Sequence, residues 1–275
     1  MPELPEVETI RKTLAMQTIG KEIEAVEVYW PRIIQKPADP DAFCLQLQNQ
    51  TIHHIGRRGK FLIFYLDDVA LVSHLRMEGK YECGPIEERD KHTHVRFFLK
   101  SGAELRYKDV RKFGTMHLFP KGEEQKALPL SQLGPEPYQD PAFTPTYLRE
   151  ICQKTTRHIK TVLLDQKAIA GLGNIYVDEA LYQAKIRPDR TAASLSNEEV
   201  RMLHEKIVTT IENAVQKGGS TVRSYVNGRG EAGKFQLELL VYGRKGQPCY
   251  QCGKEIVRTV VANRGTHYCP VCQSK

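Results

Sequence analysis

The amino-acid sequence predicts an α+β fold, with an N-terminal β-sandwich and leading helix followed by a helical region and a cysteine-rich hairpin. Three observations support this prediction. Short β-branched and aromatic runs, separated by Gly, Pro and Asp, fill residues 22–119 and are typical of a sandwich or barrel. Apolar residues recur at helical spacing from residue 146 onward. Two Cys-x-x-Cys pairs then close the chain, so we expect three domains, at residues 1–134, 135–232 and 233–275.

The first helix is expected over residues 5–19, where Val7, Ile10 and Leu14 recur near helical spacing. Six strands should follow, each rich in β-branched or aromatic residues and each bounded by turn residues. They are expected at residues 24–29, 61–66, 69–75, 94–99, 104–107 and 115–119.

The second half of the chain begins with a proline-rich stretch. Five of the fifteen prolines fall within residues 128–145, which marks a linker. Ser196 and Glu199 form the S-x-x-E pattern of a capping box, so a long helix should begin there and end near Lys217. A glycine-rich loop over residues 218–233 then leads to the cysteine pairs. Three shorter helices are expected at residues 146–154, 159–165 and 174–184.

Composition and charge restrict the class of protein. The 275 residues are 40% hydrophobic and 27% charged, which excludes a wholly disordered chain. No apolar run approaches the ~18 residues of a membrane span, and the acidic N-terminus lacks the pattern of a signal peptide. We therefore expect a soluble cytoplasmic protein. The net charge is +7, and residues 220–275 hold nine Lys or Arg against three Asp or Glu. A polyanion is the expected partner, with a solvated basic face as the alternative.

Four of the seven cysteines follow the pattern C-x2-C-x16-C-x2-C: Cys249, Cys252, Cys269 and Cys272. This spacing is typical of a tetrahedral zinc site with four thiolate ligands. Disulfides are the alternative, and the lack of a secretory signal favours the metal. Because four thiolates leave no open coordination position, we expect one structural zinc ion (Zn2+) rather than a catalytic one.

Three segments, in order along the chain, resemble one known family. The chain begins Met-Pro-Glu-Leu-Pro-Glu-Val-Glu-Thr, residues 165–176 read Asp-Gln-Lys-Ala-Ile-Ala-Gly-Leu-Gly-Asn-Ile-Tyr, and residues 241–244 read Val-Tyr-Gly-Arg. Over its whole length the chain resembles the formamidopyrimidine-DNA glycosylases, the bacterial repair enzymes for oxidised purines. The resemblance implies a monomeric N-glycosylase that excises 8-oxoguanine and formamidopyrimidines from double-stranded DNA. It also implies β,δ-elimination at the abasic site and a helix–two-turn–helix element in residues 135–232.

The chemistry of the N-terminus agrees with that resemblance. Removal of Met1 would leave Pro2 with a secondary α-amine, whose pKa of ~7.7–8.0 leaves far more nucleophile at neutral pH than a lysine at ~10.4. Its attack on the sugar C1′ would give an iminium that serves as an electron sink. The resemblance makes Pro2 the nucleophile and Glu3 a general acid or base. The alternative is a proline that only starts a helix, with an acidic residue at the helix N-terminus.

Two basic residues acquire catalytic roles by resemblance. Lys60, at the start of an apolar strand, resembles the family's β-hairpin lysine, which takes part in β-elimination. A solubilising lysine at a strand edge is the alternative. Arg264, between the two cysteine pairs, is assigned to phosphate binding and δ-elimination.

Further positions resemble the family's DNA contacts. Met77, Arg111 and Phe113 would fill the gap left by the everted nucleotide, since apolar wedges can replace base stacking and Arg can donate to the opposite base. Core positions are the alternative for Met77 and Phe113. Phosphate contacts are expected at His74, His92, Lys154, Asn174 and Arg264.

Asn174 opens a helix after Gly171 and Gly173, where backbone N–H groups favour an anion. A helix position that is often basic in the family falls on Thr155 here, next to Lys154.

The loop at residues 218–225 resembles a lid over the everted base, and glycines suit such a mobile element. Its candidate site residues are Ser220, Thr221, Arg223 and Tyr225. An ordinary connecting loop is the alternative.

Two other functions stay open. A non-catalytic DNA-binding zinc protein would be indicated by loss of Pro2 or Glu3, and both are present. The sister glycosylase for oxidised pyrimidines usually begins Pro-Glu-Gly-Pro, whereas this chain has leucine as its fourth residue. A location with the nucleoid would follow from DNA binding.

Overall fold

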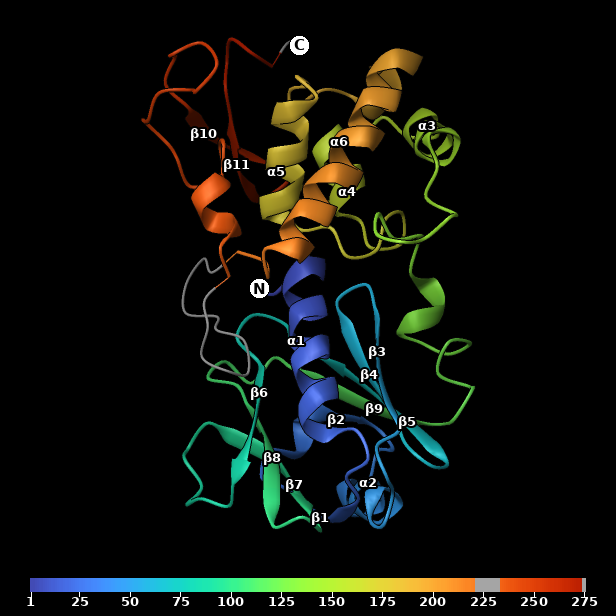
Figure 1. Ribbon diagram of the computed structural model, residues 1–275. Coiled ribbons are helices and arrows are strands. Elements are labelled where there is room, and N and C mark those ends of the chain that lie inside the picture. The colour runs from blue at the N-terminus through green and yellow to red at the C-terminus, as the bar shows by residue number, and fades with distance from the viewer. Residues whose placement is uncertain (221–232, 274–275) are drawn as a thin grey trace. The chain divides into compact units, whose positions relative to one another are not determined.

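A computed structural model describes residues 1–220 and 233–273 of the chain (Figure 1). Its residues group into two compact units. Residues 1–2 and 6–132 belong to the first, and residues 3–5, 133–220 and those from Lys234 onward to the second. No helix in the described part of the chain is both long and apolar enough to cross a membrane.

The first unit consists of two sheets, helix α2 (Pro40–Leu47) and helix α1 (Leu4–Thr18) from Glu6 onward. One sheet has the order β1-β7-β8-β6 and the other the order β2-β9-β5-β4-β3, and only the β2–β9 pair is parallel. The strands of the first sheet are β1 (Ile23–Val28), β7 (Thr93–Leu99), β8 (Ala103–Lys108) and β6 (Lys80–Pro85). Those of the second are β2 (Ile34–Lys36), β9 (Thr115–Pro120), β5 (Val69–His74), β4 (Phe61–Tyr65) and β3 (His54–Arg58).

Both sheets bury side chains in one core. Phe97 and Leu105 come from the first sheet, Phe64 and Leu71 from the second, and Val7 from α1, and all belong to the same buried cluster. The predicted β-sandwich is therefore confirmed. The buried strands either alternate apolar and polar residues or are apolar along their length. Both patterns are typical of strands in a sheet, so these strands could be predicted from the sequence.

Three strands and one α-helix of this unit were not predicted. Strands β2, β3 and β6 each form an edge of a sheet. Edge strands face solvent and carry polar residues, so the apolar periodicity is weak. Helix α2 begins after Asp39, whose carboxylate accepts the N–H of Asp41. Pro40 stands at its first position, which is a helix start signal in the sequence.

The second unit is helical with one β-hairpin (Figure 1). Ser196 and Glu199 form the predicted capping box at the start of its longest helix. The elements are α3 (Pro145–Gln153), α4 (Ile159–Leu164), α5 (Asn174–Gln183), α6 (Asn197–Gln216), β10 (Val257–Val261) and β11 (Arg264–Tyr268).

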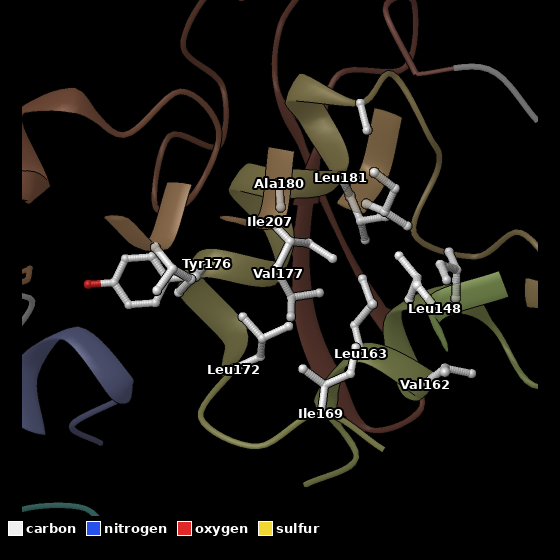
Figure 2. Close-up of a cluster of buried hydrophobic side chains, with 14 of the residues drawn as sticks. Leu148, Val162, Leu163, Ile169, Leu172, Tyr176, Val177, Ala180, Leu181 and Ile207 are labelled. Atoms are coloured by element: carbon white, nitrogen blue, oxygen red, sulfur yellow. The ribbon is translucent and has the colours of Figure 1, made fainter. Parts of the chain in front are cut away.

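Helix α5 lies at the centre of this unit. Every residue from Ile175 to Tyr182 is buried. Figure 2 shows Leu163 of α4, Val177 of α5 and Ile207 of α6 directed into the same apolar cluster. A helix that is buried all round is fixed in position by its neighbours, so the groups at its N-terminus are fixed as well.

Part of the proline-rich stretch predicted as a linker packs within the second unit. The Gly134 N–H donates to the Gln166 carbonyl (3.0 Å), and the Ala170 N–H donates to the Pro135 carbonyl (3.0 Å). A Cβ on Gly134 would lie 2.3 Å from the Ala168 carbonyl oxygen, so the two segments pack backbone to backbone. The break between the units falls between Gln132 and Leu133. The three-domain division stays a prediction.

Candidate functional site

Glu3 is the best-defined candidate catalytic residue, and its carboxylate lies in the second unit at the N-terminus of α5. Its side chain is buried, and Oε1 accepts the N–H of Ile175 (3.2 Å). The Leu4 N–H donates to the Gly171 carbonyl (3.1 Å). Because the first N–H groups of a helix lack intrahelical partners and the dipole is positive there, this is a favourable place for a carboxylate. Pro2, which precedes Glu3, is also buried.

The glycines before α5 are required by this contact. A Cβ on Gly173 would lie 2.1 Å from the Glu3 carboxyl carbon, and one on Gly171 would lie 2.5 Å from Cδ1 of Leu4. Gly171 also has a φ of +92°, which favours glycine. The Gly-x-Gly-Asn motif therefore forms the surface on which residues 3–4 rest. The anion that the structure places at this helix terminus is Glu3 itself.

Asn174, the first residue of α5, contacts the β-hairpin. Its Nδ2 donates to the Gly265 carbonyl (2.9 Å), and the Lys160 ammonium donates to the same oxygen (3.1 Å). Lys160 also forms a fully buried ion pair with Asp178 (2.6 Å), whose other oxygen accepts the His267 N–H (2.8 Å). Burial lowers the pKa of Lys160, and Asp178 opposes that shift. These contacts hold β11 against α4 and α5.

A second carboxylate on α5 holds the chain that enters the hairpin. Glu179 is buried and accepts the N–H groups of Leu240, Val241 and Tyr242 at 2.8–2.9 Å. Burial raises the pKa of Glu179, and the three backbone donors oppose that shift. Lys160, Asp178 and Glu179 were not among the residues predicted from the sequence. Their signal was a charged residue inside an apolar helical run.

Arg264 stands at the tip of the hairpin. Ala262 and Asn263 both have positive φ (47° and 62°), as a two-residue hairpin turn requires. Arg264 follows as the first residue of β11 and is exposed. The contacts of Gly265 with Asn174 and Lys160 therefore fix the backbone directly next to it.

The four cysteines predicted to bind metal lie together. Their sulfur atoms are all within 4.8 Å of one another, with 3.8 Å between Cys249 and Cys272 and 3.5 Å between Cys252 and Cys269. A tetrahedral zinc ion with Zn–S bonds of ~2.3 Å holds its sulfurs about 3.8 Å apart. A disulfide needs ~2.05 Å, and all four are free thiols. The donor set fits one structural zinc ion, and the disulfide alternative is wrong.

In the first unit, the topology brings together three residues that are distant in sequence. Strand β5 pairs with β9 up to His74 and Thr115, and β6 pairs with β8 up to Lys80 and Lys108. The connection from β5 to β6 (residues 75–79) and the connection from β8 to β9 (residues 109–114) both cross between the sheets. Because β5 is next to β9 and β6 is next to β8, the two connections lie at the same end of the sandwich.

Met77 lies in the first connection, and Arg111 and Phe113 lie in the second. Met77 and Phe113 are 41% and 51% exposed, so neither belongs to the core. The Arg111 guanidinium lies 4.7 Å from the centre of the Phe113 ring. The two connections thus present apolar and cationic groups to solvent at one end of the sandwich.

His74 and Lys60 are buried near that end. Lys60 lies in the turn between β3 and β4, and its neighbour Phe61 pairs with His74 across the strands. Burial lowers the pKa of His74 to about 3, with smaller effects of Arg76, Lys60 and His117. His74 is therefore neutral at pH 7. Because Nδ1 accepts the Arg76 N–H (2.9 Å), Nε2 carries the proton and can donate to an anion.

The other predicted DNA-contact and lid residues that the structure describes lie elsewhere in the two units. His92 is half-buried in the loop before β7, and its N–H donates to Asp90 (2.7 Å). Lys154 ends α3 and is exposed. Ser220 is buried. Thr221, Arg223 and Tyr225 lie outside the described residues.

Sequence models of three domain families match the chain: the formamidopyrimidine-DNA glycosylase N-terminal domain at residues 1–116, the formamidopyrimidine-DNA glycosylase H2TH domain at residues 133–226, and a zinc finger found in FPG and IleRS at residues 246–275. The formamidopyrimidine-DNA glycosylase of Bacillus licheniformis is 58% identical and that of Bacillus subtilis 56%, each over 100% of both chains.

Solved structures give the same result. Lactococcus lactis Fpg bound to DNA with an abasic site matches with a TM-score of 0.93 and 43% identity, over 99% of this chain and 100% of that one. A mutant of the Lactococcus lactis protein bound to Fapy-dG DNA matches with a TM-score of 0.93 and 42% identity, over 100% of both chains.

Proposed function

This chain belongs to the formamidopyrimidine-DNA glycosylase family, and we propose that Pro2 and Glu3 carry out its chemistry. The protein is a DNA repair glycosylase with one structural zinc ion. Its substrate is duplex DNA that contains an oxidised purine, such as a formamidopyrimidine or 8-oxoguanine, or an abasic site. The observation that supports the assignment is the position of the Glu3 carboxylate, which is buried and held by the N-terminus of α5. Glu3 directly follows Pro2 in the sequence.

The proposed first step is displacement of the damaged base. The Pro2 amine, exposed as a nucleophile by removal of Met1, attacks C1′, and the bond from C1′ to the base nitrogen breaks with transfer of a proton to the base. Glu3 supplies or takes up the protons of base departure and sugar-ring opening. The product is an iminium between the Pro2 nitrogen and C1′.

The iminium then allows strand cleavage. Loss of a proton from C2′ releases the 3′ phosphate by β-elimination, and a further proton loss releases the 5′ phosphate by δ-elimination. Water hydrolyses the remaining iminium and restores the amine. We assign Lys60 to the first elimination and Arg264 to the second, as a cation beside each departing phosphate.

The other candidate residues bind DNA in this proposal. Met77, Arg111 and Phe113 fill the gap left by the everted nucleotide, which offsets part of an eversion cost of a few kcal/mol. His74, His92, Lys154, Asn174 and Arg264 contact phosphates. The residues over the everted base are Ser220, Thr221, Arg223 and Tyr225. A cytoplasmic location at the nucleoid is supported by the DNA substrate.

Borohydride trapping tests the proposal. Reduction during turnover on an 8-oxoguanine duplex should leave a covalent protein–DNA adduct on the peptide that begins at Pro2, and a thymine glycol duplex should give far less. An acetylated N-terminus should abolish trapping. Glu3→Gln should lose base excision but still cleave a pre-formed abasic site, where the glycosidic bond is already broken. An adduct on Lys60 would reject Pro2 as the nucleophile.

A further inference from the structure

The two connections that carry Met77 and Phe113 both rest on Tyr107, near the end of β8. Tyr107 is fully buried. A Cβ on Gly79 would lie 2.2 Å from its hydroxyl oxygen, and a Cβ on Gly114 would lie 1.7 Å from the same atom. The hydroxyl therefore fills the space between the two glycines, one at the end of each connection. Neither connection can move toward the sandwich without displacing this side chain.

Asp109 fixes the shape of the second connection. Its carboxylate is buried and accepts the N–H groups of Arg111 (3.0 Å), Phe113 (2.9 Å) and Gly114 (2.9 Å). Its carbonyl oxygen accepts Nε2–H of His94 (2.8 Å). Hydrogen bonds from backbone N–H groups to an ionised carboxylate are about twice as strong as neutral ones. Three of them on one side chain hold residues 110–114 in a single turn.

The fluorescence of Trp30 can report on the conformation of this turn, because Lys112 of the turn contacts the Trp30 ring. The Lys112 ammonium lies 4.1 Å from the centre of the Trp30 ring, and Trp30 is the one tryptophan in the chain. Trp30 is half-buried, so its fluorescence depends on its surroundings. A change in the turn moves a cation away from this ring.

We propose that Tyr107 and Asp109 are positioning residues that hold Met77, Arg111 and Phe113 in their gap-filling arrangement before DNA binds. The inference rests on the proposed function, which gives those three side chains their role. An arrangement formed during folding saves the ordering of loops and side chains at the moment of binding. The rate of eversion and excision should then depend on Asp109 and Tyr107, which act through those three side chains.

Asp109→Asn tests the turn, with Asp140→Asn as a matched control. The Asp140 carboxylate also accepts two backbone N–H groups, those of Glu136 and Ala142. We expect Asp109→Asn to slow single-turnover excision of 8-oxoguanine at least about tenfold, since small misplacements cost one to two orders of magnitude. Cleavage of a pre-formed abasic site, which has no base to unstack, should fall less than about threefold. Trp30 emission should change in this variant alone.

Equal losses of excision and abasic-site cleavage would show a general loss of folding and reject the positioning role. Wild-type excision by Asp109→Asn would reject it as well. Borohydride trapping at Pro2 is measured in the unmodified protein and in every variant. If the unmodified protein gives no adduct, the proposed function fails, and this outcome is separate from a failure of the positioning role.

Tyr107→Phe, compared with Tyr81→Phe, tests the support between the glycines. The two tyrosines pair across β6 and β8 and their rings meet edge to face at 5.1 Å, but the Tyr81 hydroxyl donates to Ser73 (2.8 Å). Tyr107→Phe should slow excision more than Tyr81→Phe at equal thermal stability. Equal effects of the two substitutions would overturn the assignment of Tyr107.

Discussion

The chemical properties of individual side chains in this protein depend on the backbone that surrounds them. Glu3 is one carboxylate among many, but Gly173 lets the start of α5 reach it and the Ile175 N–H fixes one of its oxygens. His74 is one of nine histidines, but burial leaves it a neutral donor. In both residues the chemistry depends on local packing rather than on residue type.

Gly173→Ala should impair catalysis more than stability. The added methyl group would meet the Glu3 carboxylate, which must move away from α5. We expect base excision to fall roughly 10- to 100-fold, the usual cost of a displaced catalytic group. Single-turnover excision on an 8-oxoguanine duplex measures the effect. Gly84→Ala is the control, because its nearest atom is 3.6 Å away, and equal rates in the two variants would contradict this account.

His74 should make the protein less stable in mild acid. The pKa of His74 is about 3 in the folded protein because of burial, against ~6.5 in the unfolded chain. Between these values the unfolded state binds a proton that the folded state excludes. The stability contribution is therefore complete above about pH 6.5 and is lost as the pH falls, by up to about 1.4 kcal/mol per pH unit.

Urea unfolding at pH 7 and pH 5 checks the effect of His74. His74→Gln should lose less stability between these two pH values than the unmodified protein, whereas a substitution at the exposed His54 should follow the unmodified protein. The same loss in His74→Gln as in the unmodified protein would show that another group is responsible.

At the scale of elements, α5 organises the second unit. Its first residue contacts the hairpin, and its buried carboxylates hold β11 and the segment before β10. A helix buried along its length cannot tolerate charge unless each charged group has a partner. Lys160 and three backbone N–H groups are those partners.

Asp178→Asn should destabilise the second unit and detach the hairpin. The substitution leaves the Lys160 ammonium buried without a counter-charge, which typically costs about 3–5 kcal/mol. Urea unfolding measures the loss. Zinc content should be retained, because all four ligands remain in place, while DNA affinity falls with the misplaced Arg264. Loss of zinc together with stability would mean that the metal site, rather than the ion pair, had failed.

At the scale of the whole molecule, the C-terminal residues combine an excess of positive charge with the zinc site. The excess of basic residues in residues 220–275 includes Arg264, and zinc is the internal support of a module too small for a large core. Metal binding and folding of such a module are coupled.

Cys249→Ser should lower zinc content and DNA affinity together. The affinity of the intact protein should fall with salt at a log–log slope of about −0.9 per phosphate neutralised, and the variant should have a shallower slope because Arg264 is no longer held. Zinc content and duplex affinity across a salt series are the measurements. A zinc-free variant with the original affinity and slope would show that the hairpin does not bind phosphate.

The sequence by itself determined the features that depend on neighbouring residues. The cysteine spacing predicted the sulfur cluster, Ser196 and Glu199 predicted the start of α6, and the apolar runs predicted the central strands. The reactivity proposed for the Pro2 amine rests on the chemistry of a secondary α-amine and requires removal of Met1. Each of these signals lies within a short stretch of sequence.

Only the tertiary structure decided which distant residues meet. Glu3 and Gly173 are far apart in the sequence but in contact in the structure, and Tyr107 lies between two glycines of different loops. Lys160 and Asp178 lie on different helices, and only packing buries them together as an ion pair. Periodicity records which face of an element is apolar, but not which element covers it. That choice is made when strands pair and helices pack, because only then do side-chain directions and distances become fixed.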